Sequence, residues 1–384
     1  MWHPTLDTDL EGAMEELVNL LTGPTARRAL FRRDIAEVFR ILRDAGVSQV
    51  SLARATGQQQ LLRHAAAVLW GKPVFGPADP ISIKDVLTPV PRHVGTADIE
   101  HVAVTTDRLG QLTGDLGGIP MAAALTAHAR ASEALPSATM RDSVRQRLRV
   151  AIADVHRVAG GAAADAGLSN LARQHFVRSM DCAGVAPDQL RAMVSLDSLG
   201  CMELDAGQPN EALKIFPLGA AAAPSPLPRA LVEYHCALAL GLLGVASEAL
   251  AALCRARDSY QAASEEPRPW KHFATALPHV EGRTHLALGR FSSAAAALSE
   301  AGGGSSHMLR CKMHHFGYLA TAQLRSGEVR FGLNSAGRAI GLAKRLRSVS
   351  VRGGLAPLQE AAAARRDSAC QDLAREVAIL RRAA

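Results

Sequence analysis

The chain has 384 residues and a net charge of +7 at pH 7, and 48% of its residues are hydrophobic while only 4% are aromatic. No run of 18 apolar residues occurs, and no basic start precedes an apolar core and a cleavage site, so we expect neither a membrane span nor a signal peptide. An interior of Ala, Leu and Val without alternating β-branched runs predicts an all-α protein.

The six cysteines are widely spread and form no paired motif, which predicts reduced thiols in a cytoplasmic protein rather than a disulfide framework. They are Cys182, Cys201, Cys236, Cys254, Cys311 and Cys370. The basic residues gather at the two ends: residues 24–72 hold nine bases and three acids, and residues 338–384 hold ten bases and four acids, a local charge of +6 in each case. This asymmetry indicates contact with a polyanion, and the alternative is a solvated arginine-rich surface.

The amino-terminal part of the chain predicts three short helices separated by tight turns. The segment Asp34–Ala45 has an amphipathic pattern, and a glycine follows it. Ser48 is a good amino-terminal cap for a second helix over Gln49–Thr56, which Gly57 ends. A third segment, Gln58–Trp70, follows directly.

A proline-rich stretch, residues 72–96, interrupts the helical pattern and predicts a linker. Helices are expected to resume near Thr96 and to continue to the end of the chain. Their breaks are expected at glycine-containing stretches, including Gly160 to Gly167 and Gly353-Gly354.

A glycine followed five residues later by a small residue recurs at intervals of 49, 40, 37, 45 and 38 residues. The pairs are Gly118/Ala123, Gly167/Ala172, Gly207/Ala212, Gly244/Ala249, Gly289/Ala294 and Gly327/Gly332. Four residues beyond the small position stands Ala127, Phe176, Phe216, Leu253, Leu298 or Ala336. Such a period predicts stacked helical hairpins, because one hairpin alone cannot bury its apolar face.

Glycine at a turn, a small residue early in the second helix and a large one a turn later resemble the tetratricopeptide repeat family over roughly residues 97–347. The aromatic residues typical of the first helix are mostly missing, and the repeats exceed the usual length, so the resemblance implies an irregular array. We therefore expect residues 97–384 to form an α-solenoid whose inner face binds a peptide, a protein or a small ligand.

Residues 1–71 contain a second resemblance, carried by Ser48-Gln49, Leu52-Ala53, Thr56-Gly57 and Gln58-Gln59-Gln60. They are similar to the phage-repressor-type helix-turn-helix of actinobacterial xenobiotic-response-element regulators that also have a tetratricopeptide-like half. The resemblance implies a DNA-binding site whose third helix enters the major groove. Its expected residues are Ser48, Gln49, Arg54, Gln58, Gln59, Gln60 and Arg63, where glutamine amides would pair with bases and arginines would contact phosphate.

The sequence departs from this family after Gln60, where the apolar run Leu61–Pro73 replaces the usual polar recognition helix. In one interpretation this run corresponds to the family's fourth helix, and most of the recognition helix is missing. In the other, Gln58–Leu69 serves as a short third helix with few base-reading side chains.

One cluster in the repeat region has the residue types of a zinc site: His307, Cys311, His314 and His315. A single helix rarely encloses a tetrahedral ion, so we expect these residues to pack between repeats and expect no metal or other cofactor. The glycine runs at Gly160-Gly161 and Gly302–Gly304 lack a P-loop ending and are expected to be loops, and no hydrolase or metalloprotease motif occurs.

The sequence thus predicts a non-enzymatic, cytoplasmic transcriptional regulator. The amino-terminal module would contact DNA, and the protein would be a homodimer that reads two half-sites. A ligand bound in the repeat domain would change the affinity of the protein for DNA. The alternative is an interaction scaffold whose helix-turn-helix no longer binds DNA specifically. A third hypothesis is a metal-dependent sensor that uses the His307–His315 cluster.

Overall fold

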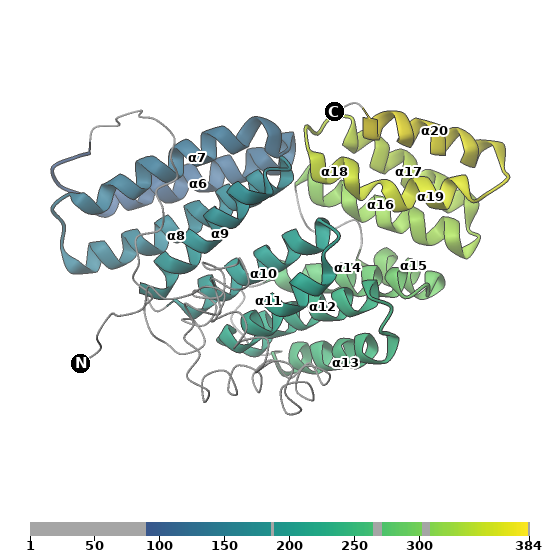
Figure 1. Ribbon diagram of the computed structural model, residues 1–384, viewed down its shortest axis with the longest axis horizontal. Coiled ribbons are helices and arrows are strands. Elements are labelled where there is room, and N and C mark those ends of the chain that lie inside the picture. The colour runs from purple at the N-terminus through teal and green to yellow at the C-terminus, as the bar shows by residue number, and fades with distance from the viewer. Residues whose placement is uncertain (1–89, 186–187, 264–270, 302–307, 383–384) are drawn as a thin grey trace, which may run out of the picture. The chain divides into compact units, whose positions relative to one another are not determined.

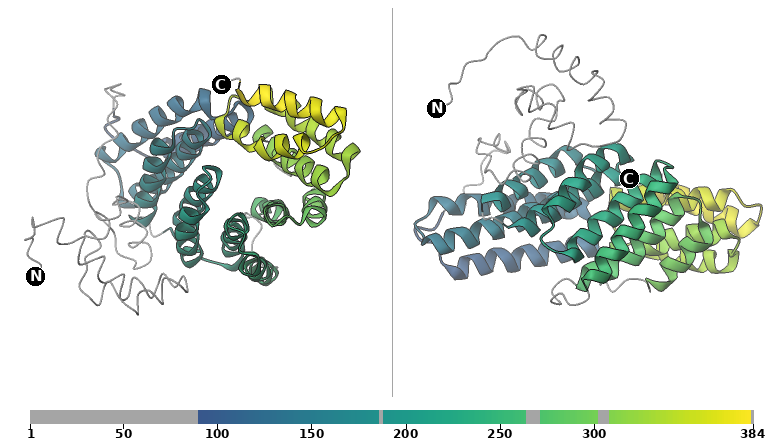
Figure 2. Two further views of the ribbon diagram at one scale, coloured as in Figure 1. Left: turned by 45° about the vertical axis from the view of Figure 1, so that its right-hand side comes forward. Right: turned by 90° about the horizontal axis from the view of Figure 1, so that it is seen from below.

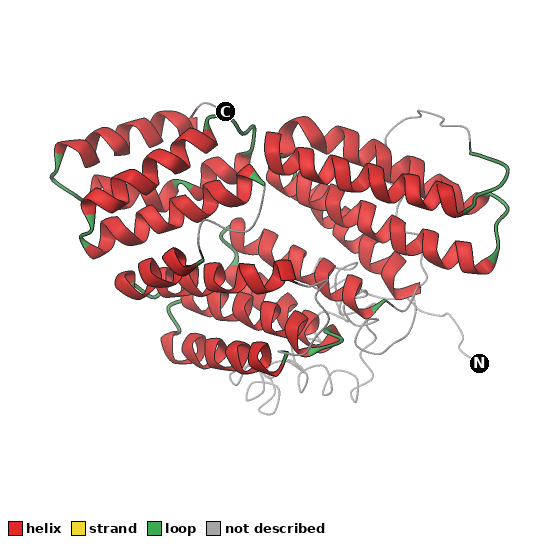
Figure 3. Cartoon of the chain, turned by 180° about the vertical axis from the view of Figure 1, so that it is seen from behind, coloured by secondary structure: helices red, strands yellow, loops and turns green. Residues whose placement is uncertain are grey.

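The computed structural model describes residues 90–185, 188–263, 271–301 and 308–382, and all of them lie in the compact unit Phe75–Ala384. The described part is helical, and its one β-type contact is an isolated bridge between His93 and Thr139 (Figure 3). The all-α prediction is therefore confirmed for these residues. The predicted helix-turn-helix module, residues 1–71, lies outside them.

The chain runs through fifteen described α-helices and one 3₁₀ turn, which Figure 1 labels. They are α6 (Thr96–Leu116), α7 (Gly118–Ala134), η1 (Leu135–Ser137), α8 (Asp142–Asp165), α9 (Ser169–Val185), α10 (Gln189–Asp205), α11 (Pro209–Ala222), α12 (Pro226–Leu242), α13 (Ala246–Ala262), α14 (Lys271–Ala287), α15 (Phe291–Glu300), α16 (Leu309–Ser326), α17 (Val329–Ala343), α18 (Val349–Gly354), α19 (Ala356–Ala363) and α20 (Ser368–Arg382).

Successive helices pair into antiparallel hairpins, α6–α7 through α16–α17, which stack side by side (Figure 2). The first helices of neighbouring hairpins contact each other, whereas each second helix packs mainly on first helices, so the first helices form an inner layer. Helices α18 to α20 follow the last hairpin and pack on α16 and α17. The predicted array of helical hairpins is therefore confirmed.

A glycine with positive φ joins the two helices of each hairpin, at 117, 167, 207, 244, 289 and 327. Five of these are glycines that the sequence pattern identified. In the first hairpin, however, the turn residue is Gly117, and Gly118 already begins α7. The register there shifts by one residue, so the buried small residue is Ala122, while Ala123 is exposed.

The expected break at Gly160 to Gly167 is wrong over most of its length, because α8 continues through Gly160 and Gly161 to Asp165. Gly160 is needed inside this helix: a Cβ there would lie 2.8 Å from the ring of Phe176. The expected break at Gly353-Gly354 is confirmed, because these glycines end the short helix α18.

Within a hairpin, the large residue of the second helix fills the space left by a small residue on the first. Phe176 lies against Gly160, and Phe216 lies against Gly200. In each pair the phenylalanine stands nine residues after the turn glycine, and the contacting glycine stands seven residues before it. Leu298 meets Gly282 in the same way. The helices approach closely because the first one lacks a side chain at this point.

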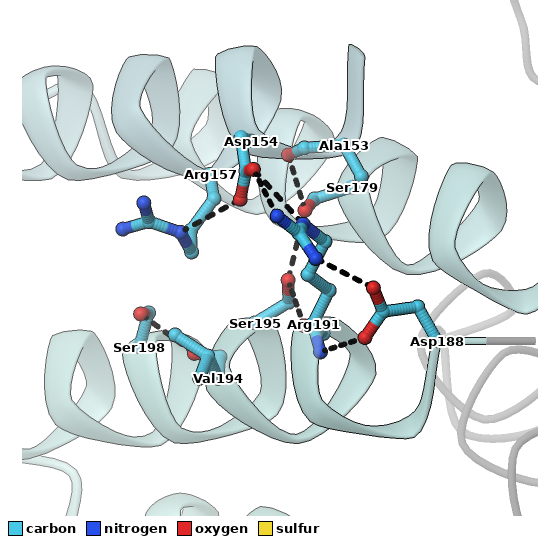
Figure 4. Close-up of polar contacts among 9 residues, drawn as sticks. All are labelled: Ala153, Asp154, Arg157, Ser179, Asp188, Arg191, Val194, Ser195 and Ser198. Atoms are coloured by element: carbon cyan, nitrogen blue, oxygen red, sulfur yellow. Dashed lines mark hydrogen bonds and ion pairs between the residues drawn. The ribbon is translucent and has the colours of Figure 1, made fainter. Parts of the chain in front are cut away.

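Polar contacts also join neighbouring hairpins, as Figure 4 shows for α8, α9 and α10. Arg191 donates hydrogen bonds to Asp154 at 2.9 Å and to Asp188 at 2.5 Å. Ser179 donates to the backbone oxygen of Ala153 at 2.7 Å and lies 2.8 Å from the hydroxyl of Ser195. Because these groups are half-buried or buried, each needs a partner, and the seam fixes the register of the helices.

The two ends of the described array meet. The amide of Arg347, which follows α17, donates to the carbonyl of Leu116 at 2.8 Å, and the amide of Ile119 donates to the carbonyl of Arg347 at 3.1 Å. Asp165, whose side chain is fully buried, accepts hydrogen bonds from the amide of Gly118 and from the hydroxyl of Ser348, the latter at 2.7 Å. The guanidinium of Arg310 lies 3.4 Å from the same carboxylate.

The glycine contact inside the hairpins yields a test on two adjacent residues of α8. Gly160→Ala should lower the free energy of unfolding by about 1 to 3 kcal/mol, because the added methyl group overlaps the fixed ring of Phe176. Gly161→Ala should raise it by up to about 1 kcal/mol, because no atom lies within 4 Å of its Cβ position and alanine favours the helix. Urea titration measures both, and equal effects of the two substitutions would contradict this packing.

The closing contact yields a second test. Asp165→Ala should lower the free energy of unfolding by roughly 2 to 5 kcal/mol, because it leaves the groups that surround the carboxylate without an acceptor. Hydrogen exchange at the amides of Ile119 and Arg347 should also become faster. Asp372→Ala, which removes an exposed carboxylate on α20, serves as the control and should change stability by about 0.5 kcal/mol or less. A wild-type exchange rate in Asp165→Ala would show that this carboxylate does not hold the ends together.

Candidate ligand-binding site

A cavity of about 380 Å³ lies against the inner layer of helices. The last turns of α10, α12 and α14 line it together with the middle of α16, and residues of α18 and α19 complete the wall. This volume falls within the range of sites that hold small organic molecules. Its walls come from elements more than 150 residues apart, so only the closed array forms it.

One part of the wall is apolar. Leu238 and Leu242 lie one turn apart on α12, Leu286 and Ala287 come from α14, and Pro357 comes from α19. Leu242 is unusually exposed for such a residue, at 48%, because it faces this space. Exposed leucine beside further aliphatic side chains favours a ligand with an apolar part.

The other part of the wall is polar and charged. The guanidinium of Arg283 lies 4.7 Å from the centre of the Tyr318 ring, and its Nη2 is 3.7 Å from Oδ1 of Asp205. The stacking of a planar guanidinium on an aromatic ring is a favourable contact that holds the side chain in place. Asp205 is half-exposed and presents a carboxylate to the same space.

The enclosure changes the acid–base properties of these groups. Burial raises the pKa of Tyr318, so its phenol keeps its proton. Burial, aided by Arg310 and Arg283, lowers the pKa of His314 to about 3, which leaves its imidazole neutral. The site thus offers a fixed cation, a carboxylate and neutral hydrogen-bonding groups.

Helix α18 approaches this polar end very closely. A Cβ on Gly354 would lie 2.8 Å from the ring of His314, so only glycine fits there. The helix is held in place because Ser348 accepts the amide of Val351 at 3.0 Å while it donates to Asp165. Val351 and Leu355 are fully buried. The segment from Ser348 to Leu355 is therefore firmly packed where it forms part of the cavity wall.

A second polar cluster lies on α10 and α12. Nδ1 of His235 is 2.6 Å from Oδ1 of Asp197, and Sγ of Cys201 is 3.6 Å from both nitrogens of the same ring. These three are the one group in the described ranges whose ligand atoms gather closely enough to suggest a metal ion. However, nitrogen and oxygen ligands of tetrahedral zinc stand about 3.3 Å apart, given metal–ligand bonds of about 2.0 Å. The 2.6 Å contact is a hydrogen bond, and burial raises the pKa of the Cys201 thiol well above its usual range, which favours the protonated form.

A third polar cluster connects α7, α8 and α9, and its two histidines are fully buried. The Nδ1 atoms of His156 and His175 lie 2.9 Å apart, and Nε2 of His156 is 3.2 Å from Glu133. Two ring nitrogens at this distance need one proton between them. Burial, with a further contribution from His156, lowers the pKa of His175 to about 4. His156 and Arg178 overcome the effect of burial on Glu133 and lower its pKa to about 2.

The structure separates the residues that the sequence grouped as a zinc candidate. His314 faces the cavity beside Tyr318, while His315 is buried against His279 and Phe316. His307 lies outside the described residues, as do all the predicted DNA-binding residues: Ser48, Gln49, Arg54, Gln58, Gln59, Gln60 and Arg63. The six cysteines all lie within the described part of the chain, and all are free.

Sequence reasoning did not identify the cavity residues Asp205, Arg283 and Tyr318. A signal for one of them exists: Asp197, Cys201 and Asp205 follow at intervals of four on α10, which puts three polar groups on its inner side. No comparable pattern marks Arg283 or Tyr318, because they meet Asp205 through the stacking of hairpins.

Comparison with protein-family models, with curated proteins and with solved structures finds no match to this chain. In the residues that the structure describes, every helix is too short or too polar to cross a membrane.

The buried histidine pair predicts how stability depends on pH. His175 titrates near pH 4 in the folded protein and near 6.5 when unfolded, so the unfolded chain binds more protons between these values. Stability should therefore fall as the pH is lowered from 6.5 towards 4, by up to about 1.4 kcal/mol per pH unit for this group. His175→Gln should flatten the dependence measured by urea titration, whereas His101→Gln, on an exposed part of α6, should leave it unchanged. Identical slopes in all three proteins would contradict this assignment.

Proposed function

We propose that the hairpin array is the sensor domain of a transcriptional regulator and that it binds a small amphipathic molecule in the cavity of about 380 Å³. The observation that carries the proposal is the composition of this cavity: leucines on one part of the wall, and Arg283, Asp205 and Tyr318 on another. A molecule with an apolar body and a polar or anionic end matches both parts.

The closed array favours a small ligand over an extended peptide or a folded partner. The segment from Ser348 to Leu355 occupies the inner side of the hairpins, and the backbone hydrogen bonds of Arg347 join the last hairpin to the first. An open groove, which a protein-interaction scaffold would need, is therefore not the arrangement of these residues. This favours the sensor over the scaffold as the function of the domain.

The regulatory half of the proposal rests on the resemblance of residues 1–71 to a helix-turn-helix module. Ser48, Gln49, Gln58, Gln59 and Gln60 would lie at the ends of its helices nearest to DNA, and Arg54 and Arg63 would contact phosphate. Six free thiols agree with a cytoplasmic protein. Two copies of the module in a homodimer would read two half-sites.

Fluorescence of the amphipathic anion anilinonaphthalene sulfonate tests the cavity. The dye should bind saturably to the native protein, and Arg283→Ala should weaken it about tenfold by removing the cation for the sulfonate. Ala287→Trp, which fills the cavity, should abolish binding, whereas Ala296→Trp on the exposed side of α15 should not. Equal binding to Ala287→Trp and Ala296→Trp would show that the dye binds elsewhere.

A gel shift against the region upstream of the coding sequence, at two salt concentrations, tests the regulatory half. Specific regulation requires tighter binding to this region than to unrelated DNA at both concentrations. Equal, weak binding to all sequences with a steep salt dependence would contradict it. Gln58→Ala should reduce binding to the specific fragment alone, while Arg63→Ala should reduce binding to both.

A further inference from the structure

A second cavity, of about 430 Å³, lies between the short helix α18 and the end of α20. Arg352 of α18 and Arg381 and Arg382 of α20 line it, Gln359 of α19 closes one side, and Val349 and Ala378 contribute apolar surface. It shares Gly353 with the central cavity and otherwise has its own lining.

The charge of this cavity is unbalanced. Three arginines line it, and no carboxylate is among its described lining residues. Elsewhere in the array, arginines of the inter-hairpin contacts face acids: Arg173 pairs with Glu203, and Arg257 pairs with Glu281. On α20 itself the acids are engaged by other bases, Asp372 by Arg375 and Glu376 by Lys344. Gathering like charges without counter-charges costs free energy that an anion would recover.

One of the three guanidinium groups is held in place by a hydrogen bond. Nη1 of Arg381 donates to Oε1 of Gln359 at 2.6 Å, which orients the planar group at the edge of the cavity. Arg352 is half-buried and lines the cavity from α18, while Arg382 is exposed. A planar guanidinium that is held as that of Arg381 is can match the oxygens of a phosphate group bidentately.

The helix dipole offers a simpler explanation for arginines near helix ends. Cations in the last turn of a helix interact favourably with its dipole, typically by about 0.3 to 1 kcal/mol. This interaction accounts for basic residues at each end separately. It does not account for three of them from two helices facing one cavity.

We propose that this cavity binds a small molecule that carries two or more phosphate groups. Three guanidiniums match the charge of such a group, and the volume lies within the range of small-molecule sites. A nucleic-acid backbone would instead require bases spread along an exposed track. The site is separate from the proposed sensor cavity, because Arg283, Asp205 and Tyr318 do not line it.

Calorimetry of the full chain with inorganic pyrophosphate, at constant ionic strength, tests this proposal. We expect saturable binding of one pyrophosphate per chain. Arg352→Ala should weaken it at least about tenfold, and Arg352→Lys, which keeps the charge without the fork, should weaken it less. The matched control is Arg375→Ala on α20, which lies outside the cavity and should leave the affinity unchanged.

Three outcomes would overturn the proposal: no saturable binding, equal weakening by Arg375→Ala, or displacement of pyrophosphate by random duplex DNA whose affinity also depends on Arg352. If thermal unfolding shows that Arg352→Ala is not folded, Arg381→Gln repeats the measurement from α20. Because Arg283→Ala should leave pyrophosphate binding unchanged, failure here and failure of the sensor cavity are separate results.

Discussion

The carboxylate of Asp165 is the point at which the ends of the array are joined. It is fully buried, and it accepts hydrogen bonds from the first residue of α7 and from the cap of α18, residues that are 47 and 183 positions away along the chain. A buried carboxylate is costly unless its oxygens are satisfied, so this contact specifies one arrangement of the two ends. The central cavity depends on it, because α18 forms part of the cavity wall and Ser348 anchors α18.

The composition of the chain explains how closely the two helices of a hairpin approach each other. With few aromatic residues, the interior is dominated by alanine and leucine, and glycines such as Gly160 and Gly200 receive the rings of Phe176 and Phe216. Helices that pack through small residues lie close together, so the hairpins themselves are compact.

The sequence was informative about the hairpins because their determinants are local. A turn glycine in the left-handed region, a small residue five positions later and a large residue four positions beyond can be read without tertiary contacts. The turn glycine stands where expected in five hairpins, and the buried large residue follows in four of them, while Ala336 takes its place in the hairpin of Gly327. The first hairpin was misplaced by one residue, since two adjacent glycines, Gly117 and Gly118, offer the same local signal. Their tertiary contacts differ, because a Cβ on Gly117 would overlap the backbone of Arg347, a distant residue, whereas one on Gly118 would overlap the end of α8.

The site was much less predictable, for the same reason. His314 looked like a member of a zinc cluster, because only neighbours in sequence could be weighed. Arg283 and Tyr318 meet Asp205 through the stacking of three hairpins, and their spacing follows no period. The closure by Asp165 has no sequence signature either, since a lone aspartate at a helix end usually faces solvent.

Closure and ligand binding are linked through α18. A molecule in the central cavity would contact α14 and α16 on one side and Ser350 and Gly354 on the other, so it would bind the closed array better than an open one. Such a ligand stabilises closure by the difference between its two affinities, and closure raises its apparent affinity by the same amount. The second cavity uses Arg352 of the same helix, and an anion there would act on the same equilibrium. The short helix α18 thus lines both proposed sites and is anchored at the Asp165 contact.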